Sequence, residues 1–116
     1  MAAAVTIAPI ATDKVEDWRA FLAELQGARR TEWAQSQRRR GITKQVITIG
    51  ALDPPIAVVY TETDDATQAD ERLAASTDPF DIWFREKVTN LHDDPYETEV
   101  VFDSSPRRGP WRGWRR

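Results

Sequence analysis

Residues 42–63, ITKQVITIGALDPPIAVVYTET, decide the fold that we expect for this chain. The two ends of the stretch, Ile42–Gly50 and Ile56–Thr63, are rich in β-branched side chains, which favour strands. Between them, Asp53-Pro54-Pro55 cannot continue a helix or a central strand, because proline lacks the backbone N–H. The stretch therefore predicts two strands joined as a β-hairpin.

The sequence before the hairpin predicts a strand followed by a long helix. Residues 5–10, VTIAPI, read as a strand, and apolar side chains then recur on one helix face at Val15, Trp18, Leu22 and Leu25. The helical pattern continues to Arg40, where Gly41 stops it, a length of about 40 Å at 1.5 Å per residue. Such a helix overhangs a strand, so we expect its end to contact a second subunit, with Gly27 as a place to bend.

The sequence after the hairpin predicts helix and then strand again. Residues 66–75 are helical in pattern, and a fresh helix begins at Pro79, with Thr77 or Asp78 as its cap. Asp93-Asp94-Pro95 ends that helix, and residues 96–103 alternate as a last strand. The complete order is β-α-β-β-α-β, which predicts an α+β, ferredoxin-like fold with a four-stranded antiparallel sheet.

Each predicted strand carries apolar side chains on both of its faces. The residues concerned are Ile7, Val46 or Ile47, Val58 or Val59, and Val100 or Val101. Because helices cover only one face of such a sheet, we expect a second copy of the chain to cover the other. In this respect residues 4–103 resemble the dimeric α/β-barrel superfamily, and residues 76–88, STDPFDIWFREKV, are similar to the second-helix motif of its small uncharacterised bacterial members.

The resemblance implies a homodimer with a small-molecule pocket, and it does not specify one reaction. Members of that superfamily include cofactor-independent monooxygenases, haem-degrading enzymes, peroxidases, isomerases and stress-response proteins. We therefore expect a protein that binds a small apolar molecule, with monooxygenase or isomerase activity on an aromatic or polyketide-like substrate as the enzymatic form of that hypothesis. A non-enzymatic dimeric interaction module is the alternative.

Three polar residues are candidates for acid–base or anchoring roles. Tyr60 and Glu62 share a face of the third strand, and a phenol and a carboxylate in one cavity would suit proton transfer. Arg29 falls in the middle of the apolar stripe of the first helix, where it would anchor an anion or carbonyl, or pair with an acid. The alternatives are an exposed strand end for Glu62 and a surface or dimer contact for Arg29. We expect the apolar wall at Trp18, Trp83 and Phe84.

His92 is the chain's only histidine and ends the second predicted helix. In haem-binding relatives a histidine on this helix ligates iron, so haem binding through His92 is a further alternative. Against it, the first strand lacks the asparagine expected of haem-degrading members, and His92 lies roughly 100° from the apolar face, as a surface histidine would. The chain has no cysteine and no phosphate-binding or nucleophile motif, so we expect neither a metal nor a cofactor.

Charge divides the chain into a domain, residues 1–103, and a tail, residues 104–116. The formal net charge is −3, and because the tail carries five arginines and no acid, residues 1–103 carry −8. An acidic domain repels phosphates, which argues against general nucleic-acid binding, whereas the Arg/Trp tail suits an acidic partner of an interaction module. Without a basic leader, an apolar span or a cysteine, we expect a cytoplasmic protein with no transmembrane segment.

Overall fold

The predicted hairpin lies in a three-stranded antiparallel sheet in the computed structural model, which describes residues 2–104. Strands β2 (Ile42–Gly50) and β3 (Ile56–Thr63) have the predicted bounds, and β1 (Ala2–Pro9) pairs with the other edge of β3. The strand order is β1-β3-β2. Residues 105–116 of the predicted tail lie outside the described residues.

The predicted long first helix is two helices. After a 3₁₀ turn, η1 (Thr12–Lys14), helix α1 (Val15–Gln26) ends at Gly27 and α2 (Arg30–Arg40) begins three residues later. Gly41 ends α2 as predicted, with a φ of 75° that favours glycine. Because the chain bends at Gly27, the 40 Å helix that was expected to reach a second subunit is absent.

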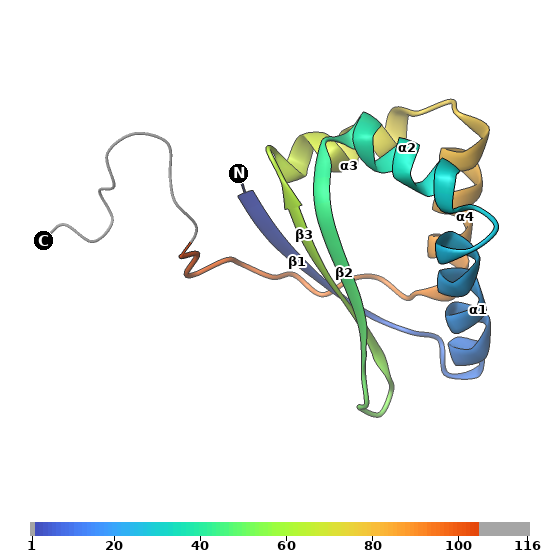
Figure 1. Ribbon diagram of the computed structural model, residues 1–116. Coiled ribbons are helices and arrows are strands. Elements are labelled where there is room, and N and C mark those ends of the chain that lie inside the picture. The colour runs from blue at the N-terminus through green and yellow to red at the C-terminus, as the bar shows by residue number, and fades with distance from the viewer. Residues whose placement is uncertain (1, 105–116) are drawn as a thin grey trace, which may run out of the picture.

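The remaining helices have the bounds that the sequence predicts. Helix α3 (Ala66–Ala75) is capped by Asp65, and α4 (Pro79–Leu91) is capped by Asp78, whose carboxylate accepts a hydrogen bond from the Phe80 N–H at 2.9 Å. Pro79 occupies the first turn of α4, where its missing N–H costs nothing. All the helices labelled in Figure 1 lie on the same side of the sheet, so no helix within residues 2–104 covers its other face, which we call the bare face.

The predicted fourth strand is not formed as a strand. Residues 93–98 run beside β1, where the Tyr96 N–H donates to the Ile7 carbonyl at 2.8 Å and the Asp93 N–H to the Pro9 carbonyl at 2.9 Å. At the next position the Val5 carbonyl accepts a hydrogen bond from the Thr98 hydroxyl, where a strand would supply a backbone N–H. A regular ladder needs backbone N–H groups at these positions. The described sheet therefore has three strands and an adjoining extended segment.

A buried carboxylate fastens α2 to α4. Asp81 is 1% exposed, and its two oxygens accept hydrogen bonds from the hydroxyls of Ser36 at 2.5 Å and Ser76 at 2.6 Å. The Arg39 guanidinium completes the cluster at 3.1 Å. Burial alone would raise the pKa of Asp81, but these donors outweigh it and hold the pKa below its ordinary value. Beside this cluster lies the apolar core, made by Ile10, Trp18, Phe21, Leu25, Ala57, Phe80, Phe84 and Leu91.

Candidate functional site

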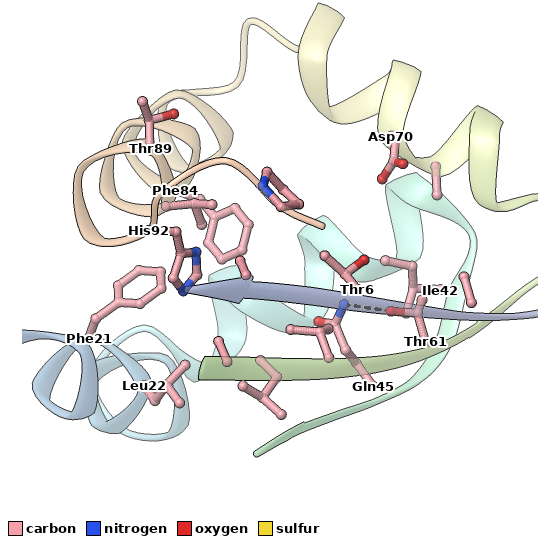
Figure 2. A pocket seen from close by; sticks show the side chains of 18 of the residues that line it. Thr6, Phe21, Leu22, Ile42, Gln45, Thr61, Asp70, Phe84, Thr89 and His92 are labelled. Carbon is pink, nitrogen blue, oxygen red and sulfur yellow. Dashed lines mark hydrogen bonds between the residues drawn. The ribbon is translucent and has the colours of Figure 1, made fainter. Parts of the chain in front are cut away.

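A cavity of about 340 Å³ lies between the sheet and the helices (Figure 2). Its floor is formed by side chains of the covered face of the sheet: Ala4, Thr6, Ala8, Gln45, Ile47, Ala57, Val59 and Thr61. Several are small, and Ala8 lies opposite Ala57 in the register of β1 and β3. Because no bulky side chain rises from this pair of strands, the helices leave space above them.

The cavity has an aromatic end and a polar end. Its aromatic side chains are Trp18, Phe21 and Phe84, grouped with His92, which bridges to Ile10 just beyond β1. Arg40 and Asp70 line the other end, near the start of β2. Figure 2 shows Phe21, Phe84 and His92 on one side of the cavity and Asp70 on the other. Phe84 lies between the two ends, since its ring centroid is 5.6 Å from that of Phe21 and 5.5 Å from the Arg40 guanidinium.

His92 is held in one tautomer by a neighbour in the cavity wall. The indole Nε1–H of Trp18 donates to Nε2 of His92 at 2.8 Å, so in a neutral ring the proton lies on Nδ1. Burial lowers the pKa of His92, which favours that neutral form at neutral pH. Within residues 2–104, Nδ1 has no hydrogen-bond partner. His92 therefore presents a free N–H donor at the aromatic end.

This arrangement does not fit the haem-ligand role considered for His92. Iron ligation needs the lone pair of a ring nitrogen, and the Nε2 lone pair already accepts the Trp18 N–H. His92 also caps the end of α4, where its backbone N–H donates to the Val88 carbonyl at 3.1 Å. The ring is thus fixed as a hydrogen-bonding group, and we assign no haem chemistry to it.

Arg40 is the least satisfied polar group of the cavity wall. Its side chain is 5% exposed, and its Nε and Nη2 atoms are buried without a hydrogen-bond partner in the described part of the chain. The guanidinium lies 5.6 Å from the ring centroid of Trp33 and 5.5 Å from that of Phe84. Burial lowers the pKa of Arg40, although Asp81 and Asp70 oppose this by attraction. Aromatic faces offer such a cation partial compensation, but no acceptor.

Asp70 lies at the mouth of the cavity on α3, within electrostatic reach of Arg40. Asp70 is an exposed residue, but its carboxyl group is partly buried. This burial raises the pKa of Asp70, and attraction to Arg40 opposes the increase. No ion pair joins Asp70 to Arg40 in the described residues. Exposed residues complete this rim at Thr89, Asp93, Asp94 and Pro95. The cavity is therefore open to solvent along one side.

The structure places the predicted site residues in three separate groups. Trp18, Phe84 and His92 meet in the cavity wall. Tyr60 and Glu62 lie on the bare face of β3 instead, because Val59 and Thr61 occupy the covered face. There the Tyr60 hydroxyl donates to Glu62 Oε2 at 2.6 Å, and this hydrogen bond is the main cause that raises the pKa of Tyr60.

Arg29 and Trp83 form a contact outside the cavity lining. The Arg29 guanidinium lies 4.0 Å from the ring centroid of Trp83 and pairs with Glu24 at 2.9 Å and Glu32 at 3.2 Å. Of the predicted alternatives, this is pairing with an acid, here with Glu24 of α1 and Glu32 of α2. Arg29 is therefore already supplied with acceptors where the structure places it.

Arg40 and Asp70 are the cavity residues that sequence reasoning missed. Arg40 ends the run Arg38-Arg39-Arg40, which reads as a solvated helix end. A signal was nevertheless present, because Trp33, Ser36 and Arg40 are spaced by three and four residues and so share one helix face. All three are shielded from solvent to some degree in α2. A cation that shares a helix face with tryptophan therefore indicated a partly buried position for Arg40.

Comparison with models of protein families and with curated proteins finds no match to this chain. No helix within residues 2–104 is long and apolar enough to cross a membrane. The same residues contain no cluster of three or more histidine, aspartate or glutamate side chains that could hold a metal ion. The cavity and its side chains are therefore the features from which a function can be inferred.

Proposed function

We propose that this protein binds a small, largely apolar molecule in the cavity between its sheet and its helices. The observation that carries the proposal is the cavity itself, whose volume of about 340 Å³ falls in the range of about 300 to 1,000 Å³ usual for ligand pockets. Apolar walls with a few polar groups are also typical of such pockets. Here the polar groups are His92 at one end and Arg40 with Asp70 at the other.

The shape of the aromatic end favours a flat ligand, and its chemistry favours a carbonyl. Phe21 and Phe84 have ring centroids 5.6 Å apart, and aromatic rings pack well against a further ring. The free Nδ1–H of His92 would donate to a carbonyl oxygen lying among them. A neutral imidazole that donates in this way stabilises a developing enolate, and the proton that leaves the carbon would pass to a rim carboxylate, Asp93 or Asp94. This supports extending the proposal to an isomerase or cofactor-independent monooxygenase.

A homodimer with the ferredoxin-like α/β-barrel architecture is the second part of the proposal. The bare face of the sheet carries Val5, Ile7, Val46, Val58 and Tyr60, and Val46 is 42% exposed. Exposed apolar surface of this kind is typical of an interface. The bridge between Tyr96 and Ile7 supports the proposal that residues 96–103 would add a fourth strand beside β1, in the lateral order of a split β-α-β sheet. Val46→Glu should convert the dimer to a monomer in sedimentation analysis.

Calorimetric titration with 2-naphthol, a flat neutral probe, tests the binding proposal. Ala8→Leu places a larger side chain on the cavity floor and should weaken binding by at least about tenfold, because the added atoms take the space of the probe. Ala23→Leu is the matched control, since Ala23 is exposed on α1 and does not line the cavity. Equal affinities for the two variants, or no binding to the unmodified protein, would contradict the proposal.

A further inference from the structure

We infer that Arg40 is the anchor for a carboxylate, so that the ligand of the cavity is an aromatic or other apolar acid. The inference rests on the proposed function, because it names the chemical class of the molecule that the cavity binds. It starts from the buried guanidinium of Arg40, which is 5% exposed and lines the polar end.

A buried cation without acceptors is costly, and Arg40 has two nitrogens in that condition. Nε and Nη2 are both buried and unpartnered in the described part of the chain. The cost of burying a charge is recovered only when opposite charge and hydrogen-bond acceptors meet it. The planar guanidinium offers parallel N–H groups that match the two oxygens of a carboxylate. A carboxylate is therefore the ligand group that this side chain fits best.

The nearby carboxylates of the chain do not fill this role. Asp81 already accepts hydrogen bonds from Ser36, Ser76 and Arg39. Asp70 attracts Arg40 electrostatically but makes no ion pair with it within residues 2–104. Arg40 lines the cavity, and a carboxylate that enters from the mouth would meet its covered Nε and Nη2 atoms once the side chain turns toward the cavity.

The rest of the cavity suits the body of such an acid. With its carboxylate at Arg40, an acid of this kind would pass Phe84, which lies 5.5 Å from the guanidinium, and extend over the alanine-lined floor toward His92. The cavity volume of about 340 Å³ accommodates one or two fused rings. Asp70 stands beside the anchoring point as a like charge, so it would oppose the acid and admit it more readily when protonated.

The test compares 1-naphthoate with 2-naphthol by calorimetric titration of the full chain. Arg40→Met should weaken 1-naphthoate binding by roughly 10- to 100-fold, because charge-assisted hydrogen bonds are lost, and should leave 2-naphthol binding unchanged. Arg29→Met removes the same charge from an arginine that also lies on a tryptophan but outside the cavity lining, and it should change neither affinity. Arg40→Lys, which keeps the charge without the planar fork, should lose an intermediate amount.

Asp70→Asn tests whether the carboxylate of the ligand, and not that of Asp70, is the partner of Arg40. If Arg40 binds an incoming acid, removing the like charge should tighten 1-naphthoate binding severalfold. Equal 1-naphthoate affinity in Arg40→Met and the unmodified protein, with 2-naphthol still bound, overturns the anchor and leaves the binding proposal standing. Weaker 1-naphthoate binding in Asp70→Asn also overturns it, because Asp70 would then assist the ligand. If neither probe binds the unmodified protein, the binding proposal itself fails.

Discussion

Asp81 and Arg40 are both buried ionic groups close to the end of α2, and they differ in what surrounds them. Asp81, at 1% exposure, has Ser36, Ser76 and Arg39 around its oxygens. Arg40, at 5%, has ring faces and two nitrogens without acceptors. Asp81 holds α2, α4 and the loop at Ser76 together, and its hydrogen bonds are all made within the chain. Arg40 is complete only with an acceptor from elsewhere, and so we assign Asp81 to the fold and Arg40 to the site.

The largest change in stability is expected from removing the Asp81 carboxylate, which has its hydrogen-bond donors within the chain. Asp81→Ala should lower the free energy of unfolding by about 3 kcal/mol, because it leaves Ser36 and Ser76 without acceptors and Arg39 with a weakened pairing. Urea denaturation followed by circular dichroism measures the change, and Asp17→Ala on the exposed face of α1 is the control. A loss below about 1 kcal/mol would contradict the structural role of Asp81.

Neighbouring arginines should respond in opposite directions to the same substitution. Arg39→Met removes a donor from the buried Asp81 and should lower the free energy of unfolding by about 1 kcal/mol. Arg40→Met replaces a buried, unpaired cation with an apolar side chain of similar length and should raise it by about 1 kcal/mol. The same urea experiment measures both variants. If Arg40→Met lowered the free energy of unfolding as much as Arg39→Met does, the expected difference between the two arginines would be wrong.

His92 lies between Asp81 and Arg40 in the number of hydrogen bonds that its side chain makes within the described residues. Its substitution should give the smallest effect, a change in how stability depends on pH. Its folded pKa is lowered by burial, so the unfolded chain binds the proton more readily. Stability should therefore be fully present above the unfolded pKa of about 6.5 and fall as the pH drops through and below it. Denaturation midpoints at pH 8 and pH 5 measure the slope, and His92→Gln should reduce it. An unchanged slope in that variant would mean that His92 titrates alike in both states.

Local patterns predicted most of the elements because their signals lie within a few residues. The hairpin strands and α3 have the predicted bounds, and Pro79 with Asp78 begins α4 as expected. The long first helix was wrong because Gly27 was given only as a place to bend, whereas it ends α1. Pairing partners across the sheet are not local, so the extended segment at Thr98 was mistaken for a strand.

The site was harder to predict because it depends on which face of the sheet the helices cover. β3 carries apolar side chains on both faces, so its sequence alone does not decide between Tyr60 and Val59 as the cavity residue. Trp18 and Phe84 were recognised as wall residues from helical spacing. His92 lay off that face on a helical wheel, but its position as the C-cap of α4 and its bond to Trp18 bring it to the cavity.

The central claim is that Arg40 lacks its acceptor until an acid enters the cavity. A crystal structure of the protein with 1-naphthoate tests it most directly. We predict the carboxylate oxygens within about 3 Å of the Arg40 guanidinium nitrogens and the rings over the floor toward Phe84. A cavity without the naphthoate, in which Arg40 is hydrogen-bonded to Asp70 instead, would contradict the account.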